Sequence, residues 1–356
     1  MRTMAGDRTP ARLGLALALA LLGLALQPTP LQAAPNAWPP WIRTVAYTST
    51  GDHTKQLTQF YVPRDAKGPV PLLVGLHSWG GDYTQKLGVA YARWAVSQGW
   101  AFLHPNFRGP NRGPDTTGSD LVVEDVISAV EYAFEHANID RDRVYLIGYS
   151  GGGHVGLLLA GRAPSYWAAV SAWGPISDLA LWHEQVTRVA PRYLRSIESC
   201  CGGPPGASAA IDNQYRRRSP LGVLPLARGQ VAFDLNAGLY DGHRGAPVPV
   251  RQALLAFNAL AAPEDAFTDA DIAHLTRHAE IPDHLRHELV ADPVYEHRSP
   301  VYRRTSGPVR VTLFKGGHNM LPEPGLTWLA QQRRSTTLEA RARRAMLRVV
   351  RAFEQL

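Results

Sequence analysis

The sequence contains very little cysteine, and this excludes several classes of protein. Only two of its 356 residues are cysteines, and these two, Cys200 and Cys201, are adjacent. A small domain held together by several spaced disulfides is therefore excluded. Two neighbouring ligands are also too few for a zinc site. The pair could form a strained disulfide with each other or stay reduced in a loop before Gly202, and we expect the reduced form.

Long apolar runs are also scarce. The clearest run, residues 13–26, follows three arginines among the first twelve residues and precedes Ala33 and Ala34. A basic start, an apolar centre and small residues at the end are typical of a secretory signal peptide. The run is too short to span a bilayer comfortably. We therefore expect residues 1–34 to be a signal peptide of a secreted or periplasmic protein without stable membrane insertion, an uncleaved membrane anchor being the alternative.

A basic face with interleaved aromatic residues is not evident either. The formal charge of +7 is spread along the chain, with local clusters at 216–218 and 341–344. This distribution argues against nucleic acid as a partner. The composition, with 45% hydrophobic and 19% charged residues, is that of a globular protein with enough apolar material for a large core.

Short strand patterns alternate with helical patterns along most of the chain. Strands are expected at 41–50, 56–62, 70–77, 101–105, 143–149, 168–173, 231–237 and 309–314, and helices at 83–98, 120–137, 248–262, 323–332 and 335–353. The alternation predicts an α/β fold, a mostly parallel sheet with helices on both faces. We expect one domain, residues 35–356, with helical and loop insertions forming a cap at about 178–226 and 263–304.

A glycine-rich turn follows the expected strand at 143–149 and precedes a helical pattern. The turn, residues 148–152, reads GYSGG and fits GxSxG, in which a serine stands on a strained corner between a strand and a helix. Glycines on both sides of the serine avoid clashes with the neighbouring backbone. The positive end of the following helix can stabilise an oxyanion at this corner. We predict that Ser150 is a nucleophile, the alternative being a turn without a catalytic role.

A serine nucleophile needs a base, and the base needs an orienting acid. On a sheet of this kind they follow the ends of later strands, in the order serine, acid, histidine. His318 comes just after the strand at 309–314 and is the only one of 13 histidines in that context. Asp241 follows the strand at 231–237 and is the predicted acid. Asp234 is the alternative if that strand is placed wrongly.

An oxyanion formed at the serine needs two N–H donors. One is expected from Gly151, directly after the nucleophile. The other is expected from the turn HSWGG that follows the strand at 70–77. Either Ser78 or Trp79 can supply it, and the sequence leaves that choice open.

These motifs together resemble the α/β-hydrolase superfamily, more narrowly the catalytic domain of prolyl oligopeptidase-like serine hydrolases and related secreted polysaccharide acetyl and feruloyl esterases. The resembling stretches begin at Leu72 (LLVGLHSWGG), Asp142 (DRVYLIGYSGGG), Asp241 (DGHRGAPVPVRQALLAFN) and Lys315 (KGGHNMLP). The resemblance covers roughly residues 55–335. It implies an α/β-hydrolase fold and a serine, histidine and aspartate triad that needs neither metal nor cofactor.

Two departures from the peptidases of that family favour an esterase. Peptide-cleaving members usually carry a large N-terminal β-propeller, whereas about 35 residues separate the expected signal peptide from the first core strand. The oxyanion turn reads HSWGG where the peptidases tend to have HGGP. We therefore expect a secreted serine hydrolase that cleaves small-molecule or polysaccharide esters through an acyl-enzyme.

Two other functions remain open on the sequence. The first is a prolyl oligopeptidase-like peptidase or amidase, for which Glu184 and Glu198 are weak candidates to bind a substrate amino group. The second is a non-catalytic binding protein on the same fold.

Several aromatic and histidine side chains could lie near the site. Trp173, Trp182 and Tyr193 could line a pocket for an acyl group or a sugar, or they could be buried packing, and the sequence leaves both open. His154 and His183 could also be close. We expect His154 to pack on the helix after Ser150.

Overall fold

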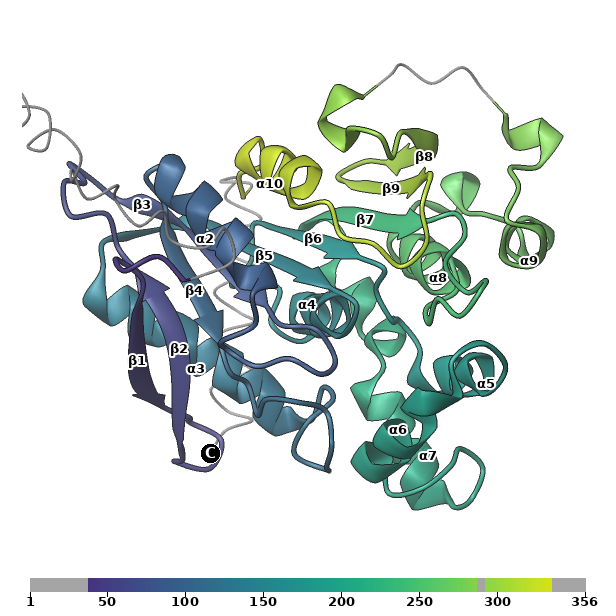
Figure 1. The fold of residues 1–356 in the computed structure, drawn as a ribbon, viewed down its shortest axis with the longest axis horizontal. Coiled ribbons are helices and arrows are strands. Elements are labelled where there is room, and N and C mark those ends of the chain that lie inside the picture. Colours follow the sequence, from purple (N-terminus) through teal and green to yellow (C-terminus); the bar gives the residue numbers. More distant parts are fainter. Residues whose placement is uncertain (1–37, 287–291, 335–356) are drawn as a thin grey trace, which may run out of the picture. The chain divides into compact units, whose positions relative to one another are not determined.

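The computed structural model describes residues 38–286 and 292–334. The expected signal peptide at 1–34 and the expected helix at 335–353 lie outside the described residues. In the described part, a nine-stranded sheet forms the centre of the fold and helices cover both of its faces (Figure 1). None of the described helices combines the length and the apolar character needed to cross a membrane.

The sheet is mostly parallel, as predicted. Its strand order is β1-β2-β4-β3-β5-β6-β7-β9-β8. The strands from β4 to β9 in this order run parallel, whereas β1 and β2 at one edge and β8 at the other run antiparallel to their neighbours. The strands are β1 Arg43–Thr48, β2 Lys55–Tyr61, β3 Val70–Leu76, β4 Ala101–Pro105, β5 Ile139–Tyr149, β6 Ala169–Trp173, β7 Ala232–Gly238, β8 Pro300–Ser306 and β9 Val309–Phe314.

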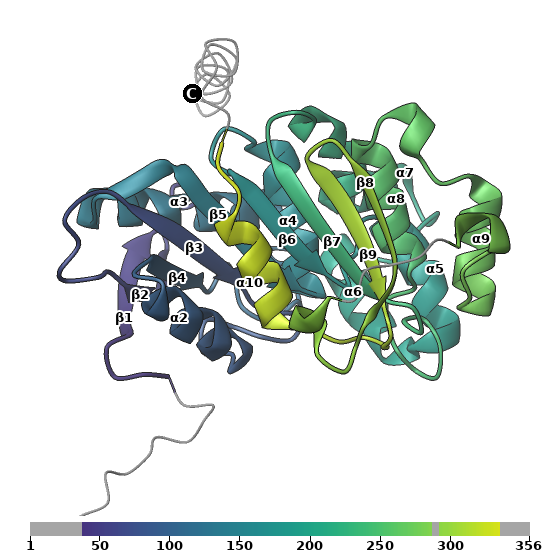
Figure 2. The same ribbon diagram turned by 90° about the horizontal axis from the view of Figure 1, so that it is seen from above.

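The helices form a layer on each face of the sheet. One layer contains α2 and α10, and the other contains α3, α4 and α8 (Figure 2). Both layers pack on strands whose continuous apolar runs are buried on both sides, as expected for parallel strands. The helices are α2 Leu87–Ser97, α3 Asp120–His136, α4 Gly151–Arg162, α5 Leu179–Val189, α6 Leu194–Cys201, α7 Ala209–Arg218, α8 Arg251–Leu260, α9 Asp269–His278 and α10 Pro322–Ala330.

Three local predictions were wrong. The expected insertion at 263–304 ends in strand β8, whose pattern is interrupted by Arg303 and Arg304. Arg303 pairs with Asp292 at 3.0 Å, and the guanidinium of Arg304 lies over a neighbouring phenylalanine ring, so both arginines fit at the sheet edge.

Helix α2 begins later than predicted because the side chain of Asp82 accepts the N–H of Thr84 and forms a turn there. The two adjacent cysteines, both buried and free, end helix α6 and do not lie in a loop.

The predicted cap at 178–226 is mainly helical. It contains α5, α6 and α7, which lie together apart from the two layers of helices (Figure 1). Arg218 at the end of α7 is buried and donates hydrogen bonds to the backbone carbonyls of Thr116 and Pro114 in the loop before α3. Asp120, at the start of α3, accepts hydrogen bonds from both Arg162 and Arg217. These contacts attach the cap to the core of the fold.

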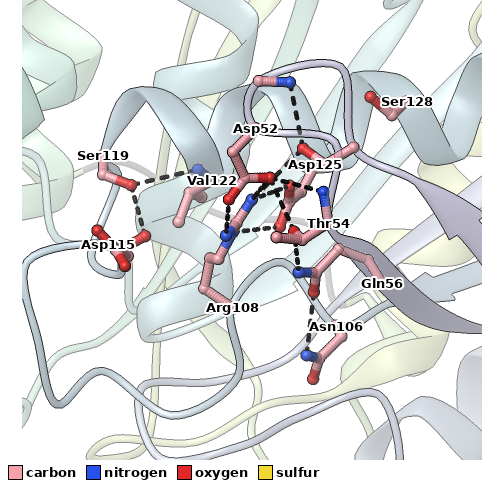
Figure 3. Close-up of polar contacts among 12 residues, drawn as sticks. Asp52, Thr54, Gln56, Asn106, Arg108, Asp115, Ser119, Val122, Asp125 and Ser128 are labelled. Carbon is pink, nitrogen blue, oxygen red and sulfur yellow. Dashed lines mark hydrogen bonds and ion pairs between the residues drawn. The ribbon is translucent and has the colours of Figure 1, made fainter.

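Arg108 connects three elements of the fold: the loop after β4, the turn between β1 and β2, and α3 (Figure 3). Its guanidinium donates to both carboxylate oxygens of Asp125 in α3, at 2.8 and 2.9 Å. It also donates to both carboxylate oxygens of Asp52, in the turn between β1 and β2, at 2.7 and 2.9 Å. The side chain of Asp125 is completely buried, whereas that of Asp52 is partly exposed. Arg108 therefore joins the N-terminal hairpin to α3, beside the hydrogen bonds of Thr50 with Glu124 and Ser128 of that helix.

Replacing Arg108 with methionine is expected to lower the free energy of unfolding by about 3–5 kcal/mol, because it leaves the buried carboxylate of Asp125 without its cation. Urea unfolding measures the change. The matched control is Arg188→Met, because Arg188 pairs with Glu184 on an exposed helix face and such a pair contributes at most about 0.5 kcal/mol. An Arg108 variant as stable as the Arg188 variant would contradict the expectation.

Candidate active site

The predicted corner at Ser150 lies between the end of β5 and the start of α4. Ser150 has φ 58° and ψ −118°, a backbone conformation that residues other than glycine rarely adopt. Its N–H donates to the carbonyl of Trp173 at 2.7 Å. A Cβ atom on Gly148 would lie 2.3 Å from the backbone of Gly152, and one on Gly152 would lie 2.4 Å from the carbonyl oxygen of Leu76. The glycines of the motif therefore allow the strained turn that presents the serine.

The structure brings Asp241 and His318 together from two loops. Asp241 lies in the turn after β7, and His318 lies in the loop after β9. Oδ2 of Asp241 lies 2.6 Å from Nδ1 of His318, while Oδ1 accepts the backbone N–H groups of Gly242 and Val248. Asp241 is buried. Because the carboxylate accepts a hydrogen bond from Nδ1–H, the lone pair of the imidazole is on Nε2, where a general base needs it.

Asp234, the alternative acid, is engaged elsewhere. It lies within β7, where its side chain is fully buried. Oδ2 accepts the hydroxyl of Ser171 at 2.8 Å, and Oδ1 pairs with Arg310 at 2.7 Å. The structure thus places Asp241 against His318 and leaves Asp234 within the sheet.

His318 lies beside the corner that holds Ser150. Its ring contacts the ring of Tyr149, the residue directly before the serine, with 4.7 Å between centroids. On its other side the imidazole faces Gly174, where a Cβ atom would lie 2.9 Å from two ring atoms. Nε2 of His318 is buried and makes no hydrogen bond to any described residue, including Ser150. Catalytic hydrogen bonds are often long in structures without substrate and shorten when substrate binds.

The two predicted sources of oxyanion donors meet at the start of α4. A Cβ atom on Gly151 would lie 2.6 Å from the amide nitrogen of Trp79, so these two backbones are in close contact. The amide of Ser78 already donates to Oε1 of Gln85 at 2.8 Å. By contrast, the backbone amide of Trp79 donates no hydrogen bond to any group within residues 38–286 and 292–334. The geometry therefore favours Trp79 over Ser78 as the second donor.

The cap contacts this oxyanion turn directly. The indole N–H of Trp79 donates to the hydroxyl of Ser196 in α6 at 3.0 Å. The ring of Trp79 packs against Trp182, which in turn packs against Tyr193. The indole N–H of Trp182 donates to the carbonyl of Pro247, close to the turn that holds the acid. Trp182 is buried, whereas Tyr193 is partly exposed, with the guanidinium of Arg192 over its ring.

Trp173 does not face the cap. It is buried in a cluster with Tyr295 and Phe314, at centroid distances of 5.8 and 5.5 Å. Its indole N–H donates to the hydroxyl of Ser171. The packing interpretation therefore applies to Trp173.

The other singled-out histidines have structural partners. His154 is buried on α4, where Nδ1 lies 3.0 Å from the carbonyl of Ile176, and burial lowers its pKa to about 4. His183 pairs with Glu198 at 2.8 Å, and Glu184 lies on an exposed helix face. Both carboxylates considered as anchors for a substrate amino group thus have cationic or histidine partners.

Three residues near the site were not singled out from the sequence. The ring of His77 stacks on Phe107 at 3.7 Å, and its Nε2 lies 2.6 Å from the carbonyl of Asn106. Gln85 binds the backbone and the hydroxyl of Ser78. Tyr149 contacts His318 from the variable position of GxSxG, where the motif carries no signal. A glutamine seven residues after Ser78 carries none either, because the contact depends on how the chain folds back.

In the comparison with known families, the middle of the chain matches a family model. A model of the prolyl oligopeptidase family matches residues 90–199, which include Ser150. Among curated proteins, an uncharacterised peptidase, YtmA, of Bacillus subtilis is 31% identical over 129 residues, which cover 35% of this chain and 47% of that protein. Feruloyl esterase B of Thermothelomyces thermophilus is 27% identical over 156 residues, covering 40% and 53%. The chain therefore spans about half the length of these relatives.

Solved structures share the fold. That of a puromycin hydrolase superposes with a TM-score of 0.53 at 18% sequence identity, covering 81% of this chain and 37% of that chain. At this level of identity the likeness concerns the fold alone. The sheet with its two layers of helices is therefore a fold that this chain shares with proteins of quite different sequence.

Proposed function

We propose that this chain is a serine hydrolase of the α/β-hydrolase superfamily that cleaves carboxylic esters and, on the pattern of residues 1–34, acts outside the cytoplasm. The observation that carries the proposal is a single juxtaposition. A serine on a strained corner, an aspartate bound to a histidine and the amide of Trp79 all meet at the start of α4.

The first half of the reaction forms an acyl-enzyme. Oγ of Ser150 attacks the carbonyl carbon of the ester while Nε2 of His318 takes the hydroxyl proton. Asp241 stabilises the resulting imidazolium through its 2.6 Å contact with Nδ1. The amides of Gly151 and Trp79 bind the oxyanion. The intermediate then expels the alcohol, which takes the proton from Nε2.

The second half releases the acid. Water attacks the acyl carbonyl and gives a proton to Nε2 of His318. The second tetrahedral intermediate collapses, the carboxylic acid leaves, and Oγ of Ser150 regains its proton. None of these steps calls on a metal or a cofactor.

Ester substrates are favoured by the state of the carboxylates in the cap. An aminopeptidase, which removes residues from a free N-terminus, needs an unpaired negative charge near the site for the substrate ammonium group. Glu198 is bound to His183, and Glu184 faces solvent beside Arg188. The similarity to a feruloyl esterase points the same way, whereas the similarity to a peptidase keeps amide cleavage as the second candidate.

Matched substrates test the choice. Wild-type protein is assayed on methyl ferulate and its N-methyl amide, acetylated xylan, and aminoacyl-proline amides. We expect turnover of the esters and none of the amides, because an amide has a poorer leaving group and the two candidate anchors, Glu184 and Glu198, already have partners. Efficient cleavage of the aminoacyl-proline amides would replace the esterase proposal with the peptidase one. No turnover together with no labelling by a fluorophosphonate would contradict both.

A further inference from the structure

Tyr149 contacts the predicted base from the strand that carries the predicted nucleophile. It is the last residue of β5 and directly precedes Ser150. Its hydroxyl donates to the backbone carbonyl of His318 at 2.7 Å. Its ring also lies against the imidazole, with 4.7 Å between centroids and 36° between planes. One side chain therefore holds both the backbone and the ring of His318.

The hydrogen bond reaches a part of His318 that Asp241 does not restrain. Asp241 binds the far end of the side chain, at Nδ1. The backbone around His318 is a loop, which contains Gly316 and Gly317 and lies between β9 and α10. With the ring held only at Nδ1, the imidazole could still pivot as this loop moves. The bond from Tyr149 removes that freedom because it fixes the residue at its backbone.

The phenol of Tyr149 stays a donor under ordinary conditions. Burial, and then the nearby carboxylate of Asp241, raise the pKa of Tyr149 above its usual value. Its hydroxyl is therefore protonated at every pH at which the enzyme would be assayed. Because β5 is a central strand, paired with β3 on one side and β6 on the other, the ring is anchored on a regular element of the fold and not on a loop.

We propose that Tyr149 is a positioning residue whose hydroxyl fixes the backbone of His318, so that Nε2 remains directed at Ser150. The role rests on the proposed function, since it matters only if His318 is the base. It gives the residue between the first glycine and the serine of GxSxG a task that the motif does not encode. The nucleophile and the base are then held by the same strand end, so they move together.

The test compares two tyrosines of the same strand. Tyr149→Phe removes the hydroxyl and keeps the ring. Tyr145→Phe is the matched control, because Tyr145 also lies in β5 and donates to a backbone carbonyl, that of Gln332, at 2.5 Å. Each variant loses one such hydrogen bond, so a merely structural role predicts equal effects. Thermal unfolding establishes that both variants are folded before kinetics are measured on methyl ferulate.

The expected result is a split between the two variants. In Tyr149→Phe, kcat falls about fivefold to tenfold while KM stays within twofold, since a lost hydrogen bond of ordinary strength alters the barrier by that factor. The strongly deshielded proton of the contact between His318 and Asp241 broadens in the proton NMR spectrum, because the ring samples more positions. In Tyr145→Phe, kcat and this signal equal those of the wild type.

Other outcomes separate failure of this inference from failure of the proposed function. If wild-type protein turns over ester and Tyr149→Phe matches Tyr145→Phe in kcat and in the NMR signal, the positioning role is overturned. The same holds if Tyr149→Phe changes only KM. If wild-type protein neither turns over ester nor reacts with a fluorophosphonate, the proposed function fails, and with it the premise of this role.

Discussion

Replacing Ser150 with alanine is expected to lower kcat for esters by a factor on the order of 10⁶ and to abolish covalent labelling by a fluorophosphonate. The factor is large because the hydroxyl is the only atom group that forms the acyl-enzyme, and the remaining donors and the histidine have nothing to activate. Steady-state kinetics and labelling followed by intact-mass measurement check the two parts of the expectation separately.

The Ser150 variant must be folded for its inactivity to count. Alanine at φ 58° bears the same backbone strain as serine, so the free energy of unfolding is expected to be close to that of the wild type. Ser199→Ala is the control, because Ser199 is exposed on α6 and its hydroxyl contacts only a backbone carbonyl of its own helix. A Ser150 variant that is folded and still labelled would show that another residue is the nucleophile.

Replacing Asp241 with asparagine is expected to lower kcat by a factor on the order of 10⁴. The carboxylate oxygen that faces Nδ1 of His318 accepts a hydrogen bond from its N–H at 2.6 Å. An amide that keeps its oxygen toward the backbone N–H groups of Gly242 and Val248 turns its NH₂ group toward the imidazole. The imidazole then becomes an acceptor at Nδ1 and carries its proton on Nε2, where it cannot take the proton of Ser150.

The matched control is Asp234→Asn, in the neighbouring acid that the sequence left as an alternative. Asp234 is fully buried and pairs with Arg310, so its replacement is expected to lower stability by several kcal/mol. The folded fraction should nevertheless retain kcat within about twofold, since Asp234 contacts neither Ser150 nor His318. The opposite pattern, with kcat lost in the Asp234 variant and kept in the Asp241 variant, would exchange the two roles.

The pattern of the sequence predicts the central layer of this fold well. Strand β4 at Ala101–Pro105 and strand β9 at Val309–Phe314 have the predicted bounds, because each is a buried apolar run with clear ends. The parallel order follows from the alternation of strands and helices. Strand β8 was not predicted, since its two arginines become acceptable only when a carboxylate and an aromatic ring from other segments cover them.

The site divides in the same way. The residues that sequence reasoning proposed, Ser150, Asp241, His318 and Gly151, follow strand ends, where a parallel sheet gathers functional groups. The choice between Ser78 and Trp79 depends on Gln85, which occupies one of the two amides, and no local pattern announces that contact. The choice of the second oxyanion donor therefore depends on a side-chain contact that the sequence pattern does not predict.

Contacts between the cap and the core have a consequence for how the enzyme meets its substrate. The indole of Trp79 is hydrogen-bonded to α6, and the indole of Trp182 to the carbonyl of Pro247. Arg218, at the end of α7, is hydrogen-bonded to the loop before α3. A cap fixed to the core by hydrogen bonds at several points is not expected to move away from it when ester droplets form. The rate of the protein on a dissolved short-chain ester should therefore rise smoothly with concentration, with no jump when the ester begins to form droplets.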